Sequence, residues 1–129
     1  MYIETKKSTI ADEHYAITAR IESITYLMTT DRDASDRVAS LLASFTNILR
    51  DHFDHEERIM ADNKYDGYDA HRKHHAYLYS NLAHYTSCIS AGLIPLSKET
   101  ADTFRGWVNF HVSRFDLAFQ EWNSAQTNP

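Results

Sequence analysis

Apolar residues recur every three or four positions in four long stretches of the chain, a spacing typical of amphipathic helices. The pattern predicts helices at about residues 9–30, 34–62, 69–90 and 98–122. Polar residues, glycine or proline interrupt it in three short segments, "DRDASD", "NKYDGYD" and "AGLIPLS". We therefore expect an all-α fold, an antiparallel up-and-down four-helix bundle in which residues 1–129 form a single domain.

The helical spacing also predicts which side chains face the core of the bundle. The apolar members of the four inward stripes are Ile17, Ile21, Ile24, Met28, Val38, Leu41, Phe45, Leu49, Ile59, Leu78, Leu82, Tyr85, Ile89, Phe104, Val108, Phe115 and Phe119. Two N-caps are expected, one from Ser97 and one from Thr9 paired with Asp12. Every stripe also contains at least one histidine, so polar groups are expected in the core.

The inward histidines are His14, His52, His71, His75 and His111, and every predicted helix carries at least one. One such histidine alone is most often a core or boundary residue. However, His14 and His52 lie about 18 and 20 residues from the turn near residue 32, and the others match in the same way across the next two turns. At 1.5 Å per residue, the two histidines that flank a turn differ in height along the bundle by only about 2–5 Å. All five imidazoles are therefore expected at one level, near the end of the bundle that carries the second turn.

Two acidic residues share the same faces. Glu56 follows His52 by four positions, which places both on one side of a helix, and the two histidines of the third helix repeat this spacing. Asp116 follows His111 by five positions, which is about 140° around a regular α-helix. We expect a wide approach or a local π-type bulge to bring Asp116 into the same site.

Five imidazoles and two carboxylates exceed the ligand set of one ion, since a zinc site takes four ligands. Because carboxylates can bridge, the seven groups fit two metals. Imidazole with carboxylate suits iron, and zinc, manganese and copper are compatible with the same ligands. Burial of both carboxylates without metal would cost free energy. The other histidines and nearby acids are predicted to face solvent: Asp54, His55, Glu57, His74 and His84.

Composition and charge narrow the classes of protein that remain. The chain has 13 basic and 18 acidic residues, a net charge of −5, and no long basic run, which disfavours nucleic acid as a partner. We expect no signal peptide and no membrane span, because no stretch is apolar enough for either. The single cysteine, Cys88, excludes an intrachain disulfide. A cytoplasmic location is expected.

The order and spacing of the seven candidate ligands resemble those of hemerythrins, in particular the bacterial single-domain kind. That family carries a lone histidine on its first helix, H-x-x-x-E on the second, H-x-x-x-H on the third and H-x-x-x-x-D on the fourth. The corresponding segments here are "ADEHY", "HFDHE", "HRKHH" and "HVSRFD". Glu13 stands where the family often has glutamine, and Val108 and Val112 stand where leucine and isoleucine are usual.

The resemblance implies two non-haem irons as the cofactor. The first iron would take three histidines and the second would take two: His71, His75 and His111 for the one, His14 and His52 for the other. Glu56, Asp116 and an oxo or hydroxo group would bridge the irons. The position left open on the second iron would bind dioxygen, or small anions such as azide. The apolar neighbours expected to cover that position are Ile17, Trp107, Val108 and Val112.

The same resemblance leaves three functions to consider. The expected function is reversible binding of dioxygen by a carrier, store or scavenger. An oxygen or redox sensor is the second, and it would act through a separate partner. The third is an enzyme that reduces peroxide or nitric oxide at the same site. We expect the chain not to be an enzyme. Turnover assays distinguish an oxygen carrier from an enzyme that reduces peroxide or nitric oxide.

Overall fold

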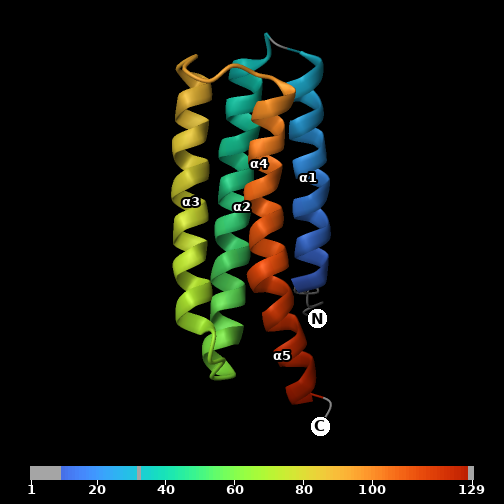
Figure 1. Cartoon of the computed structure of the whole chain (residues 1–129), viewed down its shortest axis with the longest axis vertical. Helices are drawn as coiled ribbons and strands as arrows, with labels where there is room; N and C mark the ends of the chain where they lie inside the picture. The colour runs from blue at the N-terminus through green and yellow to red at the C-terminus, as the bar shows by residue number, and fades with distance from the viewer. Residues whose placement is uncertain (1–9, 32, 128–129) are drawn as a thin grey trace, which may run out of the picture.

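The computed structural model describes residues 10–31 and 33–127, and its helices form a four-helix bundle (Figure 1). The first three helices are α1 Ile10–Thr30, α2 Ser35–Asp62 and α3 Tyr68–Ser90. The fourth consists of α4 Lys98–His111, the π-helical turn η1 Val112–Asp116 and α5 Leu117–Thr127, which follow one another without a break. No strand occurs in these residues. The predicted helices agree with the observed ones, except that α5 continues beyond residue 122.

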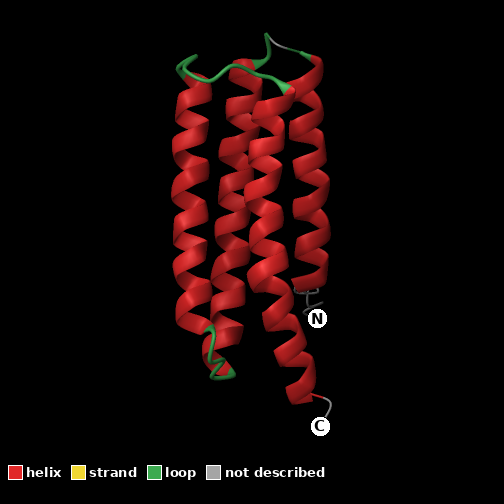
Figure 2. Ribbon diagram, viewed as in Figure 1, coloured by secondary structure: helices red, strands yellow, loops and turns green. Residues whose placement is uncertain are grey.

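Successive helices run in opposite directions, as predicted (Figure 1). Helix α1 packs against α2 and α4, and α3 packs against the same two helices. The loops are confined to the two ends of the bundle (Figure 2). The turn at residues 63–67 lies at the same end as the start of α1 and the end of α5. None of the helices in the described part of the chain is long and apolar enough to cross a membrane.

Two helix-end signals in the sequence are confirmed. Ser97 has an extended backbone, and its hydroxyl accepts a hydrogen bond from the Thr100 N–H at 3.1 Å, the geometry of an N-cap. Gly92 follows α3 with a φ of 75°, a conformation that residues with a side chain rarely adopt. Thr9, predicted to cap the first helix together with Asp12, lies outside the described residues.

The predicted core is largely confirmed, and the two errors in α2 share one cause. All predicted inward residues of α1 and α3 except the half-buried His14 are buried. In α2, however, Leu41 is 38% exposed and Ile59 is half-buried, whereas Leu42 and Met60 are fully buried. At about 100° per residue, Leu42 and Met60 lie roughly 10° from the centre of the buried stripe of α2, whereas Leu41 and Ile59 lie roughly 90° to one side of it. Phe115, predicted to be inward, is half-buried.

Candidate metal centre

The structure brings all seven candidate ligands together near the end of the bundle that carries the 63–67 turn. They come from every helix: His14 from α1, His52 and Glu56 from α2, His71 and His75 from α3, His111 from α4 and Asp116 from η1. Asp116 reaches the site because η1 is a π-helical turn, as the sequence anticipated. A π-turn holds more residues than an α-turn, so the fifth residue after His111 returns to the same face.

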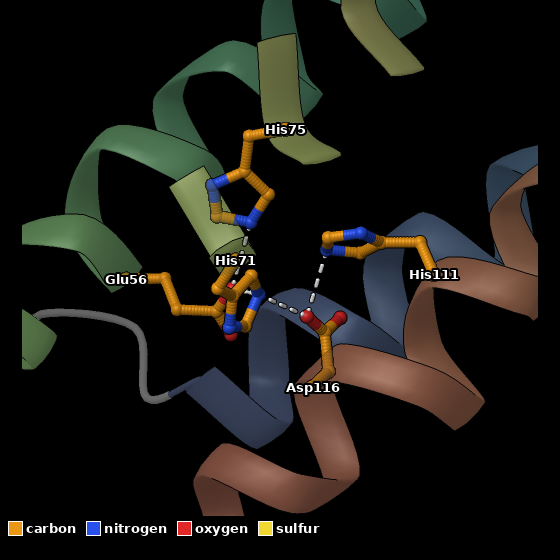
Figure 3. Close-up of side chains that lie close together, drawn as sticks. All are labelled: Glu56, His71, His75, His111 and Asp116. Atoms are coloured by element: carbon orange, nitrogen blue, oxygen red, sulfur yellow. Dashed lines mark hydrogen bonds and ion pairs between the residues drawn. The ribbon is translucent and has the colours of Figure 1, made fainter. Parts of the chain in front are cut away.

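Glu56 and Asp116 lie at the centre of the site, and three histidines surround them on one side (Figure 3). His71 Nε2 lies 2.9 Å from both Glu56 Oε1 and Asp116 Oδ1. His75 Nε2 is 3.0 Å from Glu56 Oε1, and His111 Nε2 is 2.8 Å from Asp116 Oδ1. Five buried residues therefore present one ligand atom each to a common point.

A second group shares both carboxylates with the first. His14 Nε2 lies 3.0 Å from Asp116 Oδ2, and His52 Nε2 lies 3.9 Å from Glu56 Oε2. Within each group the possible ligand atoms all lie within 4.8 Å of one another. One carboxylate oxygen of Glu56 and one of Asp116 face the first group, and the other oxygen of each faces the second. This arrangement matches two neighbouring metal ions with two shared carboxylates.

The chemistry of the donor set fits metal ions better than it fits a network of hydrogen bonds. Several buried polar atoms at the site have no hydrogen-bond partner: Nε2 of His14, His52 and His111, Nδ1 of His71, and Oε2 of Glu56. A buried polar atom without a partner costs about 1–3 kcal/mol. Four of these five atoms face the carboxylates or the opposing imidazoles, where a cation would satisfy them. The residues present therefore fit a metal centre.

Close contacts with imidazoles shift the ionisation of both carboxylates in this site. Burial favours the neutral form of Glu56, but hydrogen bonds from His71 and His75 outweigh it and lower the pKa of the carboxyl. Burial likewise opposes ionisation of Asp116, but the close imidazoles of His111, His14 and His71 lower its pKa below the usual range. Burial alone would lower the pKa of His71, yet its contacts with both carboxylates raise it to about 9. A proton on His71 thus balances carboxylate charge when no metal is bound.

Four of the five inner histidines have a polar partner on the ring nitrogen that faces away from the centre. The pairs of atoms are His14 Nδ1 with Gln120 Nε2 at 3.1 Å, His52 Nδ1 with Glu13 Oε1 at 2.7 Å, His75 Nδ1 with Glu57 Oε2 at 2.8 Å, and His111 Nδ1 with His74 Nδ1 at 2.7 Å. Metal-bound histidines commonly donate their second N–H to such a partner, which fixes the ring and its tautomer. The outer contacts therefore hold Nε2 of these rings toward the centre.

Sequence reasoning missed these outer partners. Glu57 and His55 were predicted to face solvent, which is wrong, because both are half-buried and bonded to other side chains. The carboxylate of Glu13 accepts hydrogen bonds from His52 and His55 through its two oxygens, each at 2.7 Å. These side chains lie beside the inward stripe but are long enough to reach a neighbouring helix. The three-residue spacing of the two histidines, which puts both near α1, was the available signal.

His74 is a further correction. It was predicted to point outward, but its ring is half-buried and lies against His111 and Phe115. Burial and the neighbouring imidazoles of the site lower the pKa of His74 to about 4, so this ring is neutral at pH 7. Asp54 and His84 are exposed, as predicted.

A cavity of about 80 Å³ adjoins the second ligand group. Ile17, Val108 and Val112 line it, as do the two histidines of that group. Trp107 was expected to cover the same position but does not line the cavity; its ring packs on Tyr85, with 4.9 Å between centroids. The lining is mainly apolar beyond the candidate ligands, and its volume suits a small molecule.

Fold and site together define a class of protein, a four-helix bundle with a metal site in its core. Comparison with known families agrees, because the family described as "Hemerythrin HHE cation binding domain" matches residues 5–121. The chain belongs to the hemerythrin family. The resemblance predicted from the spacing of its histidines and acids is thereby confirmed.

A curated relative shows the same relationship. The chain is 26% identical to a hemerythrin subunit of Sipunculus nudus over 87 residues, which cover 67% of each chain. No solved structure matches the chain significantly. Cation binding therefore follows from the family and from the site, whereas the ligand that the metals carry is a matter for proposal.

Proposed function

We propose that the chain is a non-haem di-iron protein that binds dioxygen reversibly, as a carrier, store or scavenger. The observation that carries this proposal is the pair of ligand groups that share Glu56 and Asp116 beside an apolar cavity. Membership of the hemerythrin family and the likeness to a hemerythrin from another organism support it.

The two ligand groups are unequal, and this inequality favours binding of a small molecule on one side. The first iron would be held by three histidines and the second by two: His71, His75 and His111, and His14 and His52. Glu56, Asp116 and an oxo or hydroxo group would be common to both. The second group thus offers one protein ligand fewer, and the cavity lies on its side.

As ferrous ions, the two irons would supply the two electrons that dioxygen takes up on binding and returns on release. The side chains of the site balance charge and hold the imidazoles in position. The buried carboxylates of Glu56 and Asp116 balance the charge of the ions. Glu13 and Glu57 hold the imidazoles of their histidine partners in place. Each of these contacts keeps a ring nitrogen aimed at the centre.

The apolar walls of the cavity keep water away from the second ligand group. Ile17 is 4% exposed and Val108 is 3% exposed, and both line the cavity. Water exclusion favours reversible binding, because solvation stabilises charged reduced oxygen species that leave the site. Small anions such as azide are expected to enter the same cavity. We further propose a cytoplasmic location and a binding role without turnover.

Metal analysis and optical spectroscopy test the proposal. Protein produced with ample iron is expected to contain close to two irons per chain. After reduction, its visible spectrum is expected to change in air and to revert when oxygen is removed. One zinc per chain, or an irreversible change on the first exposure to air, would contradict the proposal. Sustained consumption of peroxide or nitric oxide with a reductant would show an enzyme instead.

Two matched variants connect this test to the site. His111→Ala removes an imidazole that faces Asp116 and is expected to lower the iron content and abolish the spectral change. His84→Ala removes an exposed imidazole of α3 and is expected to leave both unchanged. Equal behaviour of the two variants would show that the metals are held elsewhere.

A further inference from the structure

His74 makes a contact that none of the expected ligand roles requires. It lies on α3, just before the inward His75, and its ring reaches across to α4. Its Nδ1 is 2.7 Å from Nδ1 of His111. The two ring planes differ by only 9°, with 5.0 Å between centroids. Two nearly parallel rings whose nitrogens approach this closely meet edge to edge, which is the geometry of an N–H···N hydrogen bond.

The direction of this hydrogen bond follows from the other nitrogen of His111. His111 Nε2 lies 2.8 Å from Asp116 Oδ1, within the first ligand group. An imidazole that binds metal through Nε2 carries its proton on Nδ1. His111 is therefore the donor and His74 the acceptor. As the acceptor, His74 carries its own proton on Nε2, so the two rings need only one proton between their facing nitrogens.

Aromatic neighbours hold the His74 ring in this orientation. Phe115 stacks on it with 4.5 Å between centroids and planes 20° apart, and lies 5.6 Å from the His111 ring as well. Phe110 and Tyr77 contact its flanks, at centroid separations of 5.5 and 5.6 Å. The acceptor nitrogen is thus fixed by packing on several sides rather than carried by a mobile surface side chain.

We propose that His74 is a positioning residue for the metal centre: it accepts the Nδ1–H of His111 and holds that imidazole with Nε2 toward the metals. The inference rests on the proposed function only as far as the site binds metal, and it does not depend on dioxygen. His111 differs from His52 and His75 in the partner of its Nδ1, because Nδ1 of each of those two rings faces a carboxylate. His111 has an imidazole nitrogen as the acceptor in place of a carboxylate.

Two substitutions separate the hydrogen bond from the packing of the ring. His74→Phe keeps an aromatic ring between Phe115 and the flanking residues but has no acceptor. His74→Asn loses the ring, yet its amide oxygen occupies nearly the place of the imidazole Nδ1. His84→Phe serves as the control, since it makes the same chemical change at an exposed position on the same helix.

The first measurement is the loss of bound zinc to a chelator, with zinc as a probe that carries no oxygen chemistry. We expect His74→Phe to release zinc roughly 10–100-fold faster than the unaltered protein, the usual effect of losing such a partner. His74→Asn is expected to stay within a few-fold of it, and His84→Phe to match it. Equal rates for His74→Phe and the unaltered protein would overturn the proposal, as would a larger loss in His74→Asn than in His74→Phe.

The second measurement is the long-range ¹H–¹⁵N spectrum of the zinc-bound protein, which identifies the nitrogen that carries each imidazole proton. A slowly exchanging proton on Nδ1 of His111 is expected in the unaltered protein and in His74→Asn, and faster exchange in His74→Phe. An unprotected Nδ1 proton in the unaltered protein would overturn the inference. Neither readout involves dioxygen, so failure of the proposed oxygen binding would leave both interpretable.

Discussion

Proton binding and metal binding compete directly at His71. Its Nε2 lies 2.9 Å from a carboxylate oxygen of Glu56 and from one of Asp116, and these contacts raise the pKa of the imidazole to about 9 against the opposing effect of burial. A metal ion requires the neutral ring. At pH 7 the metal-free protein must therefore release a proton from His71 when an ion binds, and above pH 9 this cost disappears.

We predict that the apparent affinity for zinc rises between pH 7 and pH 9, by up to about tenfold per pH unit for this one proton. Calorimetric titrations in buffers of different ionisation enthalpy measure the protons released, and at least one per chain is expected at pH 7. The His84→Ala variant is expected to show the same dependence. A constant affinity across this range would mean that His71 is already neutral.

The clustering of the candidate ligands was predictable from sequence, and their outer partners were not. Helical spacing fixes the direction in which a side chain leaves the backbone, which was enough to select Glu56. It does not give the distance that a long side chain reaches around a helix. Glu57 leaves its helix about 100° from Glu56 and still bonds to His75 on the neighbouring helix. Such contacts depend on how closely two helices pack, which spacing along one chain does not determine.

At the scale of elements, the end of the bundle opposite the metal centre can be altered separately. Ser97 caps α4 there through its bond with the Thr100 N–H. We predict that Ser97→Ala lowers the free energy of unfolding by about 1 kcal/mol, the typical effect of losing an N-cap. Denaturant unfolding of the metal-free protein measures it.

The matched variant is Ser97→Asp, which retains a cap and is expected to keep most of the stability. Iron content is expected to stay the same in both variants, because the cap and the metal centre lie at opposite ends of the bundle. A loss of iron in Ser97→Ala would show that the two ends are coupled.

The sequence predicted the π-turn correctly but not the end of the last helix, and both outcomes have a physical reason. The five-residue spacing of His111 and Asp116 made the π-turn predictable, because a regular α-helix would point these side chains apart. The end of the last helix was placed too early, near Trp122. The polar residues that follow contain no glycine or proline to stop a helix, and α5 continues to Thr127.

At the scale of the whole molecule, the register of the helices was predictable because helices rise by a fixed amount per residue and the turns are short. The cavity was harder to predict from the sequence, because its shape depends on side chains from several helices. The exposed residues Thr18 and Asn109 are among those that line it, and they mark the side that meets the surface, between α1 and α4. Val108 and Val112 stand next to this side.

We predict that the double variant Val108→Leu, Val112→Ile binds azide more slowly and autoxidises more slowly than the unaltered protein. Each substitution adds about one methylene to the wall, worth roughly 0.8 kcal/mol of apolar burial. The larger side chains narrow the approach without touching a candidate ligand. Stopped-flow oxidation of the reduced protein and stopped-flow azide binding, at equal iron content, measure the two effects.

The control for this experiment enlarges a buried valine away from the cavity. Val38→Ile, in the core of α2, is expected to leave the azide and autoxidation rates unchanged. If the double variant behaves like Val38→Ile, the path from solvent does not pass these two valines.

The volume of the cavity also sets an upper size for any guest. An apolar cavity that binds benzene measures about 150 Å³, and this space of about 80 Å³ is about half as large. Diatomic gases and linear triatomic anions fit these dimensions, while a sugar, an amino acid or an aromatic ring does not. The walls of the cavity therefore discriminate among guests by size. If the site holds an oxidising metal centre, these walls would shield it from larger organic molecules.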